Sequence, residues 1–253
     1  MIFYFSATGN SKYVASRIAQ ETNDKIIPIM DCIQKDIYTY LVKEGEKIGV
    51  IAPTYFWGLP NLVSDFLDKL MLELDSKPYI YYVSTYGTTT GQTGFFANQH
   101  FNKKGYSINA YFSVKMPDTW TPVFNLTNKE KMNRINEKAE TRINEIIEKV
   151  KSEKTGDFMQ NKVLKIAVNA YYPTYEKARE TKYFTVEESC IGCHLCEKKC
   201  PVAAIKIENG KPRWIKDKCV LCLGCLHRCP KFSIQYGKNT KKHGQYVHPN
   251  TQI

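Results

Sequence analysis

Eight of the nine cysteines fall into two copies of one spacing, and each copy is followed by a proline. The two runs are Cys190-x2-Cys193-x2-Cys196-x3-Cys200-Pro201 and Cys219-x2-Cys222-x2-Cys225-x3-Cys229-Pro230. Three thiolates at three-residue intervals surround one concave turn of backbone, and this spacing is typical of chains that bind a pair of [4Fe–4S] clusters. Such clusters exchange single electrons. The chemistry that the sequence indicates is therefore one-electron transfer.

The fourth cysteine of each run lies one helical turn beyond the first three and points away from them. We therefore expect it to bind the other cluster. The predicted ligand sets are Cys190, Cys193, Cys196 and Cys229 for one cluster, and Cys219, Cys222, Cys225 and Cys200 for the other. Each cysteine of the first run recurs 29 positions later, which indicates an internal repeat of two similar halves.

Two other uses of these cysteines compete with the iron–sulfur interpretation. Disulfides need an oxidising compartment, but the chain begins MIFYFSATGN without a basic region or a cleavable apolar segment. Paired zinc sites also use C-x2-C repeats, although their two ligand pairs usually stand further apart than these four cysteines within eleven residues. The sequence favours iron–sulfur clusters.

The segment that holds the cysteines is too small to bury a large apolar core. Between the two runs, residues 205–207 and 212–215 flank Glu208-Asn209-Gly210, which predicts a short hairpin. Metal–thiolate bonds would supply the folding free energy that this core lacks. We expect the unit to unfold when its iron is removed.

The amino-terminal residues predict a strand, a polar turn and a helix in succession. Residues 1–6 are apolar enough for a strand buried on both faces, and residues 12–19 repeat apolar residues at helical spacing. The turn between them contains Ser6, Ala7, Thr8, Gly9, Asn10 and Ser11. Backbone N–H groups at such a helix start can bind a phosphate, although the same residues can also serve as an ordinary helix cap.

Two later strands end in similar loops. Residues 47–52 lead into Pro53-Thr54-Tyr55-Phe56-Trp57-Gly58, and residues 79–84 lead into Thr85-Tyr86-Gly87-Thr88. In an open parallel sheet such strand ends gather on one edge, where ligands bind. Trp57 and Tyr86 offer flat faces to an aromatic ring, and the adjacent glycines let backbone approach it.

These three loops resemble the phosphate loop and the two ring-binding loops of flavodoxins. With the cysteine runs attached, residues 1–240 resemble the fused flavodoxin–ferredoxin proteins of anaerobic bacteria, the EFR-family ferredoxins. The resemblance implies non-covalent FMN, with its phosphate on residues 6–11 and its isoalloxazine ring between the loops of Trp57 and Tyr86. It also implies that the amide of Gly58 or of Gly87 responds to the redox state of the flavin.

The expected fold class is α/β, a flavodoxin-like doubly wound parallel sheet of five strands in the order 2-1-3-4-5, followed by a small two-cluster ferredoxin domain. Residues 25–29 are the second predicted strand, 107–115 the fifth, and 128–154 a long amphipathic helix. The expected division is 1–155 for the FMN domain, 156–182 for a connecting segment, 183–240 for the ferredoxin domain and 241–253 for a basic tail. Residues 116–124 are expected to cover part of the flavin, and the apolar stretch 163–172 to pack between the domains.

The formal charge of +11 contrasts with the acidic flavodoxins, but bound clusters and FMN phosphate would lower it. No helix-turn-helix or basic stripe indicates nucleic-acid binding. The tail residues Lys238, Lys241, Lys242 and His243 could steer an acidic redox partner. Nothing approaches the length of a transmembrane segment, so we expect a cytoplasmic protein. Cys32 is expected to be a buried apolar residue.

The combined expectation is an electron-transfer protein that passes single electrons between two [4Fe–4S] clusters and FMN, and so couples ferredoxin-level reductant to a redox partner protein. No pair of side chains in the sequence specifies another reaction, so no catalytic residue is predicted. The alternative is an FMN-dependent reductase of a small organic substrate, an iron–sulfur flavin oxidoreductase fed by its own clusters. The sequence leaves the oligomeric state and the direction of electron flow open.

Overall fold

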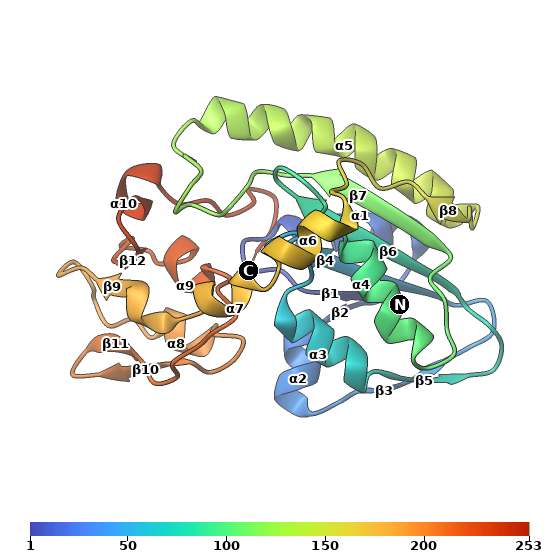
Figure 1. The fold of residues 1–253 in the computed structure, drawn as a ribbon, viewed down its shortest axis with the longest axis horizontal. Helices are drawn as coiled ribbons and strands as arrows, with labels where there is room; N and C mark the ends of the chain where they lie inside the picture. The colour runs from blue at the N-terminus through green and yellow to red at the C-terminus, as the bar shows by residue number, and fades with distance from the viewer. Residues whose placement is uncertain (253) are drawn as a thin grey trace.

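The structure is a computed structural model that describes residues 1–252 of the chain. The amino-terminal part is a parallel sheet with helices on both faces, and the carboxyl-terminal part is a smaller unit of short strands and helical turns beside it (Figure 1). The strands lie in the order β2 (Ile26–Pro28), β1 (Ile2–Tyr4), β4 (Lys47–Pro53), β6 (Tyr79–Tyr86), β7 (Ala110–Lys115) and β8 (Gly156–Asp157).

The first five strands confirm the predicted order 2-1-3-4-5, and with it the flavodoxin-like α/β fold class. The strand count was one short, because β8 adds a sixth, two-residue strand beside β7. There the N–H groups of Gly156 and Phe158 donate to the carbonyl oxygens of Asn109 and Tyr111. Two residues without an apolar alternation give the sequence no signal for a strand.

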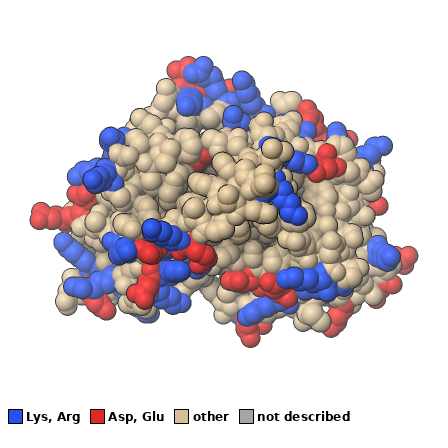
Figure 2. Space-filling model, viewed as in Figure 1, with Lys and Arg blue, Asp and Glu red and all other residues tan. Residues whose placement is uncertain are grey.

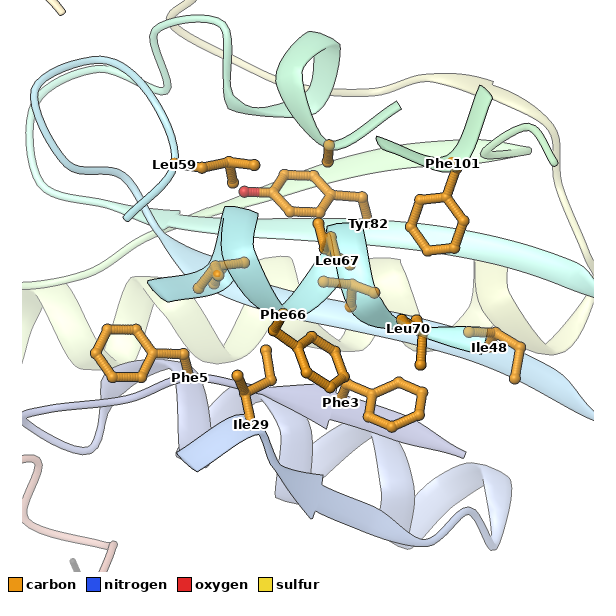
Figure 3. Close-up of a cluster of buried hydrophobic side chains, with 14 of the residues drawn as sticks. Phe3, Phe5, Ile29, Ile48, Leu59, Phe66, Leu67, Leu70, Tyr82 and Phe101 are labelled. Carbon is orange, nitrogen blue, oxygen red and sulfur yellow. The ribbon is translucent and has the colours of Figure 1, made fainter. Parts of the chain in front are cut away.

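Alternating side chains of the sheet supply two separate cores. Ile2 and Tyr4 pack with α1 (Asn10–Thr22) and α5 (Lys129–Lys151), whereas Phe3 and Phe5 pack on the opposite face. That opposite face carries α2 (Ile29–Lys35), α3 (Asn61–Lys69) and α4 (Thr93–Asn102). This is the period of two that a strand buried on both sides requires. In Figure 3, Phe3, Phe66, Leu67 and Tyr82 turn toward one another within the second core.

Two further short strands lie outside this sheet. β3 (Thr39–Val42) and β5 (Met71–Leu74) form a separate parallel pair. The long helix α5 begins one residue after Asn128, whose side-chain oxygen accepts a hydrogen bond from the Lys131 N–H at 2.8 Å. This capping fixes where the predicted helix starts. Cys32 is buried with 2% exposure, as predicted.

The carboxyl-terminal unit is built from two short antiparallel pairs. β10 (Ile205–Glu208) and β11 (Lys211–Trp214) form the predicted hairpin, and β9 (Phe184–Val186) pairs with β12 (Ile234–Tyr236). One-turn helices α8 (Leu195–Lys198) and α9 (Gly224–His227) carry cysteines of the first and second run, and α10 (Thr240–His243) follows β12. Helices α6 (Lys165–Tyr171) and α7 (Thr174–Ala178) and the 3-10 turn Thr181–Tyr183 connect the two parts.

The small core of the carboxyl-terminal unit continues into the amino-terminal part. Leu221, Leu223 and Tyr236 belong to a cluster against which Tyr55 and Trp120 pack. The apolar stretch 163–172 divides between two environments: Val168 is fully buried and Tyr172 packs in this region, but Leu164 and Ile166 are 78% and 79% exposed. The expectation that the whole stretch is buried between the domains therefore holds only for part of it.

Charged side chains of both signs are interspersed around the rim of the face shown in Figure 2, with a largely uncharged area across its centre. The tail is not a free arm. Thr240 is fully buried, and Tyr246 and His248 are 8% and 2% exposed. None of the helices within residues 1–252 has the length and apolar character to cross a membrane.

Candidate functional site

The three loops that end β1, β4 and β6 line one cavity, about 260 Å³ in volume, at the carboxyl edge of the sheet. Fourteen of the sixteen residues predicted for the flavin site lie in its wall: Ser6, Ala7, Thr8, Asn10, Ser11, Pro53, Thr54, Tyr55, Phe56, Trp57, Thr85, Tyr86, Gly87 and Thr88. The other two, Gly9 and Gly58, lie behind the cavity wall. The structure therefore brings together three segments that are far apart in the sequence.

The first loop ends at the start of α1. Gly9 has φ +97°, which only glycine adopts readily, and no side chain caps the helix. The first turn of α1 contains no acidic residue. Its amides and the positive end of the helix dipole can therefore face an anion. The Ser11 hydroxyl also hydrogen-bonds the Thr85 hydroxyl at 2.8 Å, which joins the first loop to the third.

The second loop is a tight turn that presents two aromatic side chains. The N–H groups of Tyr55 and Gly58 each donate to the other's carbonyl oxygen, at 2.9 and 2.7 Å. Phe56 and Trp57 between them have φ of +47° and +67°, as in a type I′ turn. Non-glycine residues in this region store backbone strain, which is concentrated at functional sites.

Neighbouring backbone and rings hold this turn in place. The Trp57 carbonyl oxygen accepts from the Gln92 N–H at 2.9 Å, and a Cβ on Gly91 would lie 2.0 Å from that oxygen. The Trp57 ring contacts Tyr171 with ring centroids 4.3 Å apart. Gly58 faces Tyr172 instead of the cavity, and its N–H already donates to Tyr55. A response of the Gly58 amide to the flavin would therefore require this turn to open.

One group of residues in the cavity wall was predicted only as a covering loop, and another group was not predicted from the sequence. The loop after β7, expected to cover the flavin, supplies Met116, Pro117, Asp118, Thr119, Trp120, Val123 and Phe124. Thr89 belongs to the third loop but lies one residue beyond the predicted site residues, and Tyr171, Leu221 and Leu223 were not predicted. Alternation and loop composition give no signal for Leu221 and Leu223, because their position depends on how the two parts pack.

The polar atoms of the cavity suit FMN. Asn10 Oδ1 and Thr89 Oγ1 are buried, and neither has a hydrogen-bond partner in the part of the chain that the structure describes. A ligand with several hydroxyl groups would satisfy such atoms. Uncharged donors surround the start of α1, and the aromatic side chains of Tyr55, Phe56 and Trp57 stand nearby. The wall thus offers a phosphate end, polar partners and flat apolar surface.

The two predicted ligand sets surround two separate cavities. One cavity is lined by Cys190, Cys193, Cys196 and Cys229, and the other by Cys200, Cys219, Cys222 and Cys225. Each set therefore includes one cysteine from the other run. Gly192 and the residues His194, Leu221 and Leu223 adopt positive φ, which curves the backbone of both runs around these cavities.

The chemistry of the thiols fits a metal cluster. Burial raises the pKa of the Cys219 thiol to about 12 and that of Cys196 to about 11. Without a cation these buried thiols stay protonated, because a lone thiolate is poorly solvated there. Iron supplies the positive charge that deprotonates them. We infer that the cysteines need the clusters in order to act as thiolates.

One cysteine run also reaches the cavity formed by the three loops, which we call the flavin cavity because it is where we expect FMN. Cys222 and its neighbours Leu221 and Leu223 lie in the wall of that cavity and, with the exception of Leu221, in the wall of the second cysteine cavity. None of Cys190, Cys193, Cys196 and Cys229 lines the flavin cavity. The second cysteine cavity therefore shares wall residues with the flavin cavity, whereas the first cysteine cavity shares none.

The fold and these cavities define a redox protein that combines a flavin site with an iron–sulfur unit. A flavodoxin domain model matches residues 1–144, and a 4Fe-4S dicluster domain model matches residues 189–234. Because the first match covers more than half of the chain, the chain belongs to the flavodoxin domain family, with a ferredoxin domain fused after it. It carries FMN and two [4Fe–4S] clusters. FMN accepts one or two electrons, and each cluster accepts one.

Curated relatives match over short segments. One subunit of an ion-translocating oxidoreductase complex of Methanosarcina acetivorans is 34% identical over 62 residues, which is 24% of this chain and 23% of that protein. A ferredoxin-like protein in the nif region of Trichormus variabilis is 35% identical over 49 residues, or 19% of this chain and 42% of that protein. The chain thus spans less than half the length of these relatives.

The solved structures that match are more distant. A rubredoxin oxygen:oxidoreductase of the anaerobe Desulfovibrio gigas is 16% identical, with a TM-score of 0.32, over 59% of this chain and 36% of that one. A short-chain flavodoxin associated with a PDU bacterial microcompartment is 18% identical, with a TM-score of 0.33, over 57% of this chain and 95% of that one.

Proposed function

We propose that the protein transfers single electrons in a fixed spatial order between a distal cluster, a proximal cluster and FMN. The proximal cluster is the one bound by Cys200, Cys219, Cys222 and Cys225, and the distal cluster is the one bound by Cys190, Cys193, Cys196 and Cys229. The observation that carries this proposal is the position of Cys222, which lies in the wall of both the flavin cavity and the proximal cysteine cavity.

The distal cluster is the one accessible to a partner. Ile191 beside it is 60% exposed, and Cys193 is exposed as well. By contrast, Cys219 at the proximal site is buried, and Leu221 and Leu223 around it are 4% and 2% exposed. Electrons from outside therefore reach the distal cluster first.

The two cluster sites adjoin each other. Helices α8 and α9, which carry Cys196 and Cys225, pack together. Burial raises the pKa of the Cys225 thiol, and nearby cysteine sulfurs, Cys196 among them, raise it further. The packing of α8 against α9 supports a close approach of the distal and proximal sites. A chain of three centres in one polypeptide replaces two bimolecular encounters by intramolecular steps.

The partner that this surface suits is an acidic one-electron carrier protein. Lys198, Lys199 and Lys231 are exposed beside the distal cluster, and none of them forms an ion pair with another residue in 1–252. Unpaired cations around an accessible redox site favour the approach of an acidic partner. The name of the relative from M. acetivorans, part of an oxidoreductase complex, fits a partner of this redox class.

A reductase of a small organic substrate is the competing function, and it makes a different demand on the site. It needs space for a substrate over the flavin ring, whereas a carrier needs only an edge for electron transfer. The loop with Asp118 and Trp120 and the ring of Tyr171 line the same cavity as Trp57. These side chains crowd the space where a substrate would stack, which favours the carrier.

The test uses anaerobically prepared protein with full iron and FMN content, mixed rapidly with a reduced bacterial ferredoxin. In Cys193→Ser the distal cluster is lost, and we expect reduction of FMN by the ferredoxin to slow. In Cys222→Ser we expect the distal cluster to be reduced while FMN stays oxidised for longer. Equal rates of FMN reduction in the wild type and in Cys222→Ser would overturn the proposed order. Rapid turnover of quinones or nitroaromatics by the reduced wild type would support the reductase instead.

A further inference from the structure

The last residues of the chain return from the ferredoxin domain to the flavin-binding domain. After α10 the chain crosses toward the centre of the molecule, between the two parts (Figure 1). Chain ends are usually poorly ordered unless they are tied down. Here Tyr246 and His248 are among the buried residues, so residues 245–252 pack as part of the structure. We call this segment the strap.

One end of the strap lies against the phosphate loop. The His248 N–H donates to the carbonyl oxygen of Thr8 at 2.8 Å, and the His248 ring stacks on Tyr13 of α1 with centroids 4.1 Å apart. A Cβ on Gly9 would lie 2.9 Å from Cβ of His248. The strap therefore covers the back of the Thr8–Gly9 turn and fixes the carbonyl group of Thr8.

The other end of the strap is held by α9, the helix that contains Cys225, and by Cys229 just after it. Gln245 Nε2 donates to the carbonyl oxygens of Leu226 and Cys229, at 2.6 and 2.8 Å. The Tyr246 N–H donates to Nδ1 of His227 at 3.2 Å. Gln245 and Tyr246 thus bond to the end of α9 and to Cys229, the last cysteine of the second run.

His227 extends this connection to the wall of the flavin cavity. Because its Nδ1 accepts a hydrogen bond, the proton lies on Nε2, which donates to the carbonyl oxygen of Thr119 at 2.8 Å. Thr119 lines the flavin cavity. The Tyr246 side chain also packs with Leu126 and Met132, and its hydroxyl donates to Asn136. The strap is therefore bonded to α9 and α5 and, through His227, to the loop after β7.

We propose that the strap holds the Thr8–Gly9 turn in the conformation that receives the phosphate of FMN, and that it does so only while the ferredoxin domain anchors Gln245 and Tyr246. Gln245 and His248 are positioning residues, since they act through α9 and through the phosphate loop. Assembly of the clusters then raises the affinity for FMN. The inference rests on the proposed position of the FMN phosphate at residues 6–11.

The first experiment deletes residues 245–253 and measures the dissociation constant of FMN by quenching of its fluorescence. The protein is prepared anaerobically with its clusters, and FMN is removed and added back. We expect the affinity for FMN to fall about tenfold, because the turn loses one or two hydrogen bonds that hold it. The iron content should stay unchanged. Lys238→Ala, at an exposed residue just before α10, is the matched control and should bind FMN as the wild type does.

Point variants separate the two ends of the strap. Gln245→Ala removes the bonds to α9, and His248→Ala removes the stacking on Tyr13 but keeps the backbone bond to Thr8. We expect each to weaken FMN binding by a smaller factor than the deletion does. Wild-type affinity in both variants and in the deletion would overturn the proposal.

The second experiment tests the dependence on the clusters. Iron is removed from the full-length wild type and from the deletion variant, and FMN affinity is measured again. Both proteins should lose the part of the cavity wall that Leu221, Cys222 and Leu223 supply. We expect the wild type to lose, in addition, about the factor in affinity that the deletion costs, because only the wild type has a strap to release. Equal losses in both proteins would refute the coupling. A cluster-loaded wild type that fails to bind FMN would instead refute the proposed flavin site itself.

Discussion

The carboxyl group of Asp118 packs directly on Gly87: a Cβ atom on Gly87 would lie 2.2 Å from Oδ2 of Asp118. Oδ1 of Asp118 accepts a hydrogen bond from the Trp120 N–H at 3.1 Å. Among the residues that line the flavin cavity in the described chain, Asp118 is the one with an acidic side chain, and no Lys or Arg lines it. The flavin site thus contains an acid without a compensating cation.

Asp118→Asn should raise the midpoint potential of the flavin by tens of millivolts, because a nearby negative charge opposes the arrival of an electron. Burial raises the pKa of this carboxyl group above its ordinary value. Lowering the pH through that pKa should therefore raise the potential of the wild type further than that of the variant. Potentiometric titration of both proteins between pH 8 and 5 measures the difference. Parallel pH curves would show that Asp118 does not act on the flavin.

Asn10→Ala should weaken FMN binding about tenfold, because Asn10 is buried at the phosphate loop and its Oδ1 has no partner within residues 1–252. Its Nδ2 also donates to the carbonyl oxygen of Pro117, so the loop after β7 loses a contact. Fluorescence titration with FMN gives the affinity. Gln20→Ala, at the exposed far end of the same helix, is the control. An unchanged affinity for Asn10→Ala would argue against this position of the phosphate.

Cys196→Ser should lose the distal cluster and keep both the proximal cluster and FMN. Cys196 lines the cavity shared with Cys190, Cys193 and Cys229, and none of these residues lines the flavin cavity. Analysis of iron, sulfide and flavin should show about half of the wild-type iron with full flavin. Full iron content in this variant would contradict the ligand assignment. Cys32→Ser, at a cysteine that hydrogen-bonds Tyr40 and lines neither cysteine cavity, should leave the iron content unchanged.

Acidification should loosen the strap. Burial lowers the pKa of His248 from 6.5 to about 4, so the packed strap excludes a proton that the released strap binds. The free energy of packing is then fully present above pH 6.5 and declines as the pH falls from 6.5 toward 4. The ring of His248 stacks on the ring of Tyr13, and the Lys12 ammonium group donates to the backbone carbonyl of Gln252 in the same segment.

Limited proteolysis of the tail measures this effect. Cleavage of the wild type should accelerate between pH 7 and pH 5. His248→Gln should be cleaved faster than the wild type at pH 7 but should show less additional cleavage on acidification. Identical pH profiles would show that another group releases the tail.

The sequence predicted those features that depend on local pattern. Buried runs such as residues 47–52 and 79–84 predicted the central strands, and the repeated cysteine spacing predicted which four thiols face each cavity. The three strand-end loops share a cavity because parallel strands end on one edge. Each of these patterns spans only a few residues, so the local sequence is enough to predict the structure that it forms.

Features that depend on contacts between distant segments were missed. The position of Gly58 follows from the turn at Phe56 and Trp57 and from the ring of Tyr172, which a loop motif does not specify. The charges of Lys241 and Lys242 indicated a basic tail but not its packing: His243 and Tyr246 hydrogen-bond partners more than a hundred residues away. Strand β8 depends on hydrogen bonds to the backbone carbonyl oxygens of Asn109 and Tyr111.

The loop around Cys222 has a consequence for how such a chain can evolve. Leu221, Cys222 and Leu223 complete the wall of the flavin cavity. We therefore expect that recombination cannot freely replace this ferredoxin domain by another one. A replacement from another gene would have to reproduce the shape of this wall as well as the cysteine spacing. We therefore expect the two halves of such a chain to be inherited together.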